Sequence, residues 1–149
     1  MDGIDLSGMD LSEMDISNTI FRHCALNNAV LKNAVLRNTR FEYCTMNMAD
    51  LSGADMRGVR FRYCEIREAI FDNAVMDNVE MEFTSIESTT FIDACLKDSH
   101  IYNVDAVLAA FDRADIYSLH WSHVNLDGAK FIGAKGIFAN REAVYELLR

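Results

Sequence analysis

The side chains of this sequence that could do chemistry are four cysteines and four histidines. Cys24, Cys44 and Cys64 recur every 20 residues, so three stacked thiols could bind a metal or serve as small apolar side chains. We interpret them as reduced core residues, because side chains that repeat at one position of a regular structure hold their sulfurs poorly for a disulfide. Cys95 falls outside this series and is predicted to be the most reactive thiol.

The histidines suggest a second kind of metal chemistry. His100 and His120 are also 20 residues apart, and His123 follows closely. Imidazoles brought together in this way could bind zinc, but no cysteine or carboxylate stands at a convincing ligand spacing. Surface histidines are the favoured interpretation, and we predict no metal and no cofactor.

No catalytic motif accompanies these residues. The sequence has no Gly-rich phosphate loop, no nucleophile elbow and no His-Glu-x-x-His. Its carboxylates are spread along the chain rather than grouped, which predicts a protein that is not an enzyme.

Composition narrows the class of protein further. The 149 residues suffice for one domain, half of them are hydrophobic, and proline is absent. A net charge of -9 argues against direct nucleic-acid binding through phosphate neutralisation. No segment reads as a signal peptide or a membrane span, and Met1 leads almost directly into the pattern described next. We expect a cytoplasmic protein, with export as an effector by another route as the alternative.

A five-residue period organises the chain. Stepping by five from Leu6 to Phe131 meets 26 positions, of which 24 are Leu, Ile, Met or Phe. The position two residues earlier is usually small, as at Ala49 and Ala54. This period fits neither a helix nor a strand, so each unit is predicted to point one small and one large side chain inward.

In these units the sequence resembles the pentapeptide repeat family, whose pattern is Ala-(Asp/Asn)-Leu-x-x, over roughly residues 4 to 135. The resemblance implies an all-β fold, a right-handed quadrilateral β-helix with four units per coil and about six to seven coils. Residues 20 apart should then stack, as the series Phe71, Phe91, Phe111 suggests. Residues 1–136 would form this solenoid.

Outward side chains should form ladders along the rod. Arg22, Glu42, Arg62 and Glu82 alternate in sign at 20-residue steps and predict cross-coil ion pairs, and Arg57, Asp77 and Lys97 predict another such ladder. An aromatic ladder is predicted along one corner, with support of the coil register as its favoured role and a ligand platform as the alternative. Its members are His23, Tyr43, Tyr63 and Phe83.

Two regions depart from the pattern. Ala106 is small where a large residue is expected, Trp121 is oversized one coil later, and Val107 and Leu108 occupy positions that are normally polar. Volume compensation between coils explains the first pair, and an apolar contact patch is the alternative explanation for the second. Residues 137–149 are predicted to contain a short capping or dimerisation helix. Candidate dimer or cap contacts are Val107, Leu108, Val144, Leu147 and Leu148.

Charge is distributed in bands. Residues 1–21 carry five acids and no base, residues 22–62 are net basic, and residues 65–98 carry nine acids against two bases. In the last band four acids share one outward position on successive faces and predict an acidic, partner-binding belt. These residues are Asp72, Asp77, Glu82 and Glu87.

Two functions from different classes fit these features. The first is a non-enzymatic protein-binding scaffold or effector module that acts through rigid outer faces. The second follows from the resemblance, because some bacterial pentapeptide repeat proteins are acidic, DNA-mimicking rods that bind DNA gyrase or topoisomerase IV, alter quinolone sensitivity and dimerise through the C-terminal end. The basic band argues against the second function, and a homodimer through the C-terminal end is expected.

Overall fold

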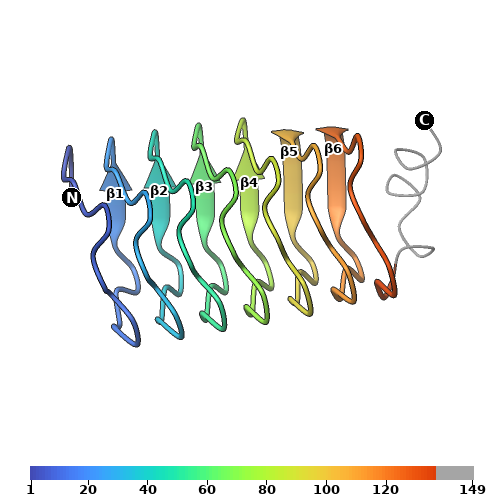
Figure 1. Ribbon diagram of the computed structural model, residues 1–149, viewed down its shortest axis with the longest axis horizontal. Helices are drawn as coiled ribbons and strands as arrows, with labels where there is room; N and C mark the ends of the chain where they lie inside the picture. Colours follow the sequence, from blue (N-terminus) through green and yellow to red (C-terminus); the bar gives the residue numbers. More distant parts are fainter. Residues whose placement is uncertain (137–149) are drawn as a thin grey trace.

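The chain winds into a rod in which successive coils lie side by side, as seen in the computed structural model, which describes residues 1–136 (Figure 1). Six strands form one parallel sheet in chain order, and each residue pairs with the residue 20 positions later, as Phe21 does with Phe41. The strands are β1 (Ile20–Arg22), β2 (Arg40–Glu42), β3 (Arg60–Arg62), β4 (Glu80–Glu82), β5 (His100–Asp105) and β6 (His120–Asn125).

Three further rows of parallel bridges run along the rod with the same step. They begin at Asp5↔Ala25, Asp10↔Val30 and Asp15↔Val35. With the sheet they make four hydrogen-bonded walls, which confirms the predicted all-β solenoid of stacked coils.

The six strands enclose five full turns. The six to seven coils expected from the sequence are therefore not confirmed; the repeat units before β1 and after β6 form bridges but no further strand within the described residues. The helix predicted within 137–149 lies outside the described residues, and so do its candidate contacts Val144, Leu147 and Leu148.

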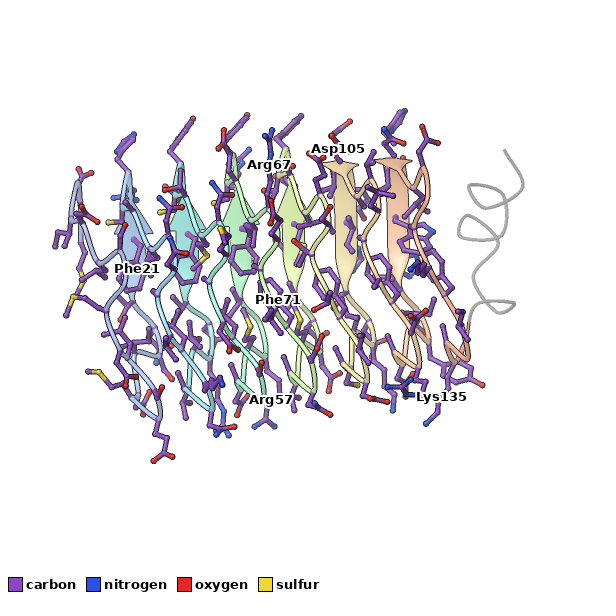
Figure 2. The ribbon with its side chains drawn as sticks, viewed as in Figure 1. Phe21, Arg57, Arg67, Phe71, Asp105 and Lys135 are labelled. Atoms are coloured by element: carbon purple, nitrogen blue, oxygen red, sulfur yellow. The ribbon has the colours of Figure 1, made fainter. Side chains whose placement is uncertain are left out.

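The core is a set of stacked columns inside the walls. Phe71, Phe91 and Phe111 stack with ring centroids 5.2 and 4.8 Å apart, and all three are buried. Figure 2 shows Phe21 and Phe71 between the walls, whereas Arg57 and Lys135 lie at the edge of the rod. The inward positions predicted from the five-residue period are therefore confirmed for the central coils.

The first coil differs from the coils that follow it. Ile4, Met9 and Met14 occupy inward small positions but are 40 to 47% exposed. Only the second coil packs against them among the described residues, so their side chains remain partly in contact with solvent.

The corners of the rod require a left-handed backbone. Every fifth residue from Gly3 to Gly133 has a positive φ, and Gly and Asn, which adopt it at low cost, fill about half of these positions. At Gly53 a side chain would also collide with Asn33 of the preceding coil.

The two inward departures from the repeat are both part of the core. Ala106 and Trp121 are buried, and the Trp121 ring packs edge-on against Phe111 and Phe131. Volume compensation between the small alanine and the large indole stays a prediction.

Candidate functional site

Ion pairs between neighbouring coils cover much of the outer surface. On the sheet formed by β1 to β6, which we call the strand face, Arg22 contacts Glu42 at 2.9 Å and Arg62 contacts Glu82 at 3.2 Å. This confirms two steps of the first charged ladder, whereas Glu42 and Arg62 form no ion pair with each other in the described chain. The second ladder is wrong, because Arg57 reaches back across two residues to Asp55 at 2.6 Å, and Lys97 pairs with Asp115 at 3.1 Å.

These pairs neutralise the basic band. Of its six arginines, at positions 22–62, only Arg40 has no carboxylate at ion-pair distance within residues 1–136. Asp55 alone receives two of them, Arg37 and Arg57, and the Arg57 hydrogen bond holds the pKa of this carboxyl well below its usual range. The band therefore offers far less free positive charge than its sequence suggests.

The acidic belt is spread around the rod rather than gathered on one surface. Asp72, Asp77, Glu82 and Glu87 each lie on a different wall. Glu82 and Glu87 are paired with Arg62 and Arg67, at 3.2 and 3.8 Å. Asp72 accepts the backbone N–H of Ile92, and Asp77 accepts the thiol of Cys95. A partner that contacts one wall would meet one belt residue.

The balance of acids over bases is largest on one wall, which we call the Glu65 face. It is the wall whose bridges run through Glu65, Ser85 and Asp105. Arg67 is its only base among the described residues, and it lies near Glu87. The acids on this wall and its adjoining corner are Asp5, Glu65, Glu68, Glu87, Asp105 and Asp127.

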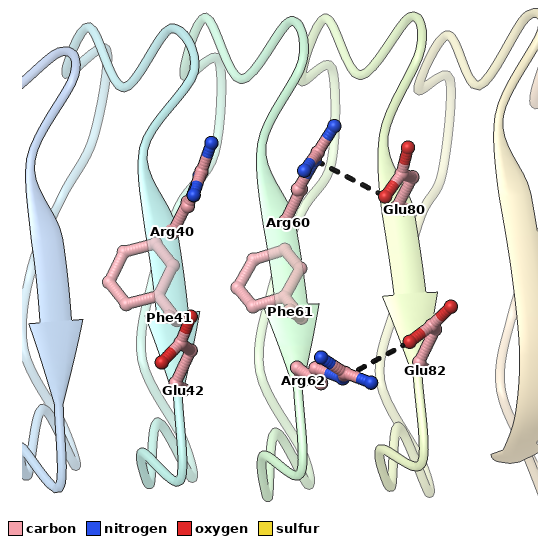
Figure 3. Close-up of a pocket in the computed structure, with 8 residues that line it drawn as sticks. All are labelled: Arg40, Phe41, Glu42, Arg60, Phe61, Arg62, Glu80 and Glu82. Atoms are coloured by element: carbon pink, nitrogen blue, oxygen red, sulfur yellow. Dashed lines mark ion pairs between the residues drawn. The ribbon is translucent and has the colours of Figure 1, made fainter.

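A hollow of about 290 Å³ lies on the strand face over β2, β3 and β4 (Figure 3). Ion pairs Arg60–Glu80 and Arg62–Glu82 form part of its wall. Arg40 is the one lining base without an ion-pair partner in the described chain, so the hollow could accept a carboxylate. Its lining residues are Arg40, Phe41, Glu42, Arg60, Phe61, Arg62, Glu80 and Glu82.

Three of the four thiols are kept from solvent in the core, including Cys44, whose pKa the bond with Cys64 lowers. Cys24, Cys44 and Cys64 are free and buried, and each Sγ lies near a backbone carbonyl. The neighbouring Cys44 thiol and burial raise the pKa of Cys64. Cys95 is the one partly exposed cysteine of the four, as its position in the repeat predicts. Burial and the bond to Asp77 nevertheless raise its pKa to about 11, and its reactivity relative to the other thiols stays a prediction.

The histidines are held by neighbouring side chains. His100 and His120 stack at 5.1 Å, and His100 Nδ1 is 2.8 Å from the Tyr102 hydroxyl. His123 Nδ1 is 2.8 Å from the Ser122 hydroxyl. Within residues 1–136 no group of three or more His, Cys, Asp or Glu side chains is arranged to hold a metal ion.

Comparison with known families explains the architecture. A profile described as a pentapeptide repeat region matches residues 2–71, and a second, for pentapeptide repeats, matches residues 54–98. The two profiles overlap and fit the four-walled coil described above. The chain belongs to the pentapeptide repeat family. No curated protein sequence matches it significantly.

Solved pentapeptide repeat structures share this fold. Trypsin-treated QnrB1 (R167E), a plasmid-mediated fluoroquinolone resistance protein, superposes with a TM-score of 0.71 at 16% identity, covering 89% of this chain and 72% of its own. Full-length QnrB1 gives 0.63 at 17% identity and covers 99% and 96%. At such low identity the likeness establishes the fold alone.

The remaining predicted contacts of this pentapeptide repeat protein lie at the surface near the last coils. Val107 is half-buried, and Leu108 is 56% exposed with its side chain over Gly128. Whether they meet a partner is untested. The described residues form no helix that is long and apolar enough to cross a membrane.

Proposed function

We propose that this pentapeptide repeat protein is a non-enzymatic binding scaffold that recognises another protein through its rigid outer walls. The observation that carries the proposal is the unequal charge of those walls. On the strand face, arginines and glutamates pair between coils, whereas the Glu65 face has one arginine among its acids. Such a wall attracts a basic protein surface and holds its carboxylates at fixed spacing along the rod.

Charge reversal on this wall tests the scaffold function. Glu65→Lys with Asp105→Lys should abolish retention of the partner by immobilised protein, because both carboxylates point outward and neither is in an ion pair in the described chain. Glu13→Lys with Asp98→Lys changes the net charge equally on other corners and should retain the partner. Equal loss in both variants would show that net charge alone, rather than this wall, drives binding.

A second function is favoured by the neutralised basic band. With most arginines paired to carboxylates, the remaining unpaired side chains are mainly acidic, as a DNA mimic requires. The partner proposed for this function is DNA gyrase or topoisomerase IV, with an effect on quinolone sensitivity; QnrB1, a fluoroquinolone resistance protein, has the same fold.

A supercoiling assay decides this second function. The wild-type protein should inhibit gyrase, and reversal of Asp72, Asp77, Glu82 and Glu87 to Lys should remove the inhibition while leaving the circular dichroism spectrum unchanged. Because each wall carries one belt residue, reversal of a single residue should have a small effect on the inhibition. A wild-type protein that leaves supercoiling unchanged at low salt would refute gyrase binding.

Assembly and location complete the proposal. We propose a cytoplasmic homodimer whose C-terminal ends meet, with Leu108 and Val107 near the contact. Light scattering on the full chain measures the oligomeric state, and Leu108→Asp should weaken a dimer that uses this patch. A monomer at all concentrations would exclude it.

A further inference from the structure

A stack of four aromatic rings forms an exposed ridge along the corner beside the strand face. His23, Tyr43, Tyr63 and Phe83 stack one per coil, with centroids 5.0 to 5.2 Å apart and planes within 14° of parallel. Tyr43, Tyr63 and Phe83 are 42 to 54% exposed. We call these four residues the aromatic ridge.

The backbone of the ridge is unfavourable for such side chains. All four residues have φ between 50° and 53°, a left-handed conformation that costs free energy for bulky residues. Other corners more often place Asn or Gly at the same position, as at Asn33 and Gly58, although Met48 and Leu108 adopt it as well. The buried phenylalanine columns already supply ring stacking that supports the coils. The fold therefore does not require the aromatic ridge, whose backbone conformation costs free energy.

The ridge also has the composition of a binding surface. The Arg62 guanidinium lies 5.7 Å from the centre of the Tyr63 ring. Tyrosine and arginine dominate the residues that contribute most to protein–protein binding, because they combine apolar area with polar groups. An exposed tyrosine stack flanked by arginine is therefore suited to contact another protein.

The charges beside the ridge identify that protein. Figure 3 shows Glu42, Arg62 and Glu82 in one row on β2, β3 and β4. Arg22 continues this row on β1, where it pairs with Glu42 in the sheet register. Because the four charges alternate in sign, a second copy of the row that runs in the opposite direction sets a negative charge opposite each positive one. A second copy running antiparallel would place Arg22 opposite Glu82 and Glu42 opposite Arg62.

We propose that the aromatic ridge is the interface of an antiparallel homodimer, with a two-fold axis perpendicular to the rods between the coils of Glu42 and Arg62. The axis brings Tyr43 of one copy against Tyr63 of the other, and every contact occurs twice. On the other side of the ridge, the same axis sets Ala25 opposite Ser85 and Thr45 opposite Glu65. The three small neutral residues permit close approach, whereas the two copies of the Glu65 carboxylate lie near each other and weaken the dimer.

The size and charge of this interface predict its strength. One ring per coil over four coils buries less surface than a standard protein–protein interface, so the dimer is weak and reversible. Its flanking ion pairs are exposed and strengthen at low salt. It is distinct from a dimer through the C-terminal end, which would leave the ridge free.

Substitution of the tyrosines separates binding from folding. Tyr43→Asn with Tyr63→Asn should raise the dimer dissociation constant at least tenfold in sedimentation experiments, without lowering the melting temperature, because Asn accepts the left-handed backbone. Met48→Asn is the matched control, since Met48 is exposed at the same turn position of another corner. Unchanged association with a lower melting temperature would overturn the proposal and assign the ladder a purely structural role.

Complementary charge changes test the antiparallel arrangement. Glu42→Arg alone sets two arginines against each other across the axis, and Arg62→Glu alone sets two glutamates against each other, so each variant should associate more weakly than wild type. Mixing the two variants restores both opposite pairs and should restore association. Mixed variants that associate no better than either alone, or a wild type that stays monomeric at about 1 mM, would overturn the proposal.

Discussion

The Cys95 thiol donates a hydrogen bond to Asp77 across one coil, with Sγ and Oδ1 2.8 Å apart. Burial and this carboxylate hold the thiol protonated, with a pKa of about 11. We therefore expect Cys95 to react slowly with Ellman's reagent at about pH 8, which is near the usual pKa of a free thiol. Cys24, Cys44 and Cys64 should also react slowly, because they are buried. All four should react rapidly after unfolding.

Removal of the carboxylate should release the thiol. Asp77→Asn lowers the pKa of Cys95 and should raise its reaction rate several-fold at constant pH, because a larger fraction is thiolate. Asp98→Asn, which removes a nearby carboxylate that does not bond to Cys95, is the control. Equal rates in all three proteins would show that access, rather than ionisation, limits the reaction.

Asp55 should make stability depend on pH in the acid range. Arg57 and Arg37 lower the pKa of its carboxyl in the folded state, so the stabilisation is complete above the unfolded pKa and is lost as the pH falls through the folded value. Asp55→Asn should cost about 1 kcal/mol at neutral pH. The difference in the free energy of unfolding between this variant and the wild type should shrink as the pH falls from about 4 towards 2. Urea unfolding at each pH measures it. A difference that is constant over this range would contradict the assignment.

Two phenylalanines should differ sharply in their contribution to stability. Phe91 is completely buried between Phe71 and Phe111, and Phe91→Ala should cost about 3 to 5 kcal/mol because it leaves a cavity in the core column. Phe83 belongs to the aromatic ridge and is 47% exposed, so Phe83→Ala should cost less than about 1 kcal/mol. Chemical unfolding measures both, and equal costs would contradict the packing described here.

Trp121, the single tryptophan, reports on the later coils. Its indole is buried, and its N–H has no hydrogen-bond partner in the described chain. The fluorescence emission maximum of Trp121 should lie at a shorter wavelength in the native protein than in the unfolded protein. Trp121→Phe should change stability by less than about 1.5 kcal/mol, because lost apolar contact is offset by removal of an unpaired buried donor. A loss as large as that of Phe91→Ala would show that the indole N–H is bonded.

The sequence predicts the walls and the core because one large side chain every five residues leaves few alternatives. Phe71, Phe91 and Phe111 share a column in any structure that turns every 20 residues. The aromatic ridge and the pair Arg22 and Glu42 follow from the same 20-residue spacing. These features depend on backbone repetition, which the sequence carries directly.

Features that depend on flexible side chains were harder to predict. Arg57 turns to Asp55 rather than to Asp77, because a long side chain reaches either its own strand or the next coil. The environment of Cys95 likewise depends on a contact 18 residues away in the sequence. The pairs at a step of 18, such as Arg37 with Asp55 and Lys97 with Asp115, are a signal that could have revealed the neutralised band.

The alternating row beside the aromatic ridge sets a rule for changing the length of the rod. Any insertion of 20 residues keeps each side chain in its column and adds about 4.8 Å. One added coil, however, would place two like charges next to each other in the row Arg22, Glu42, Arg62, Glu82. The smallest duplication that preserves both the columns and the alternation is a pair of coils. Duplication within these four coils therefore avoids local repulsion in steps of about 10 Å, whereas Tyr102 and Ser122 impose no such rule on the later coils.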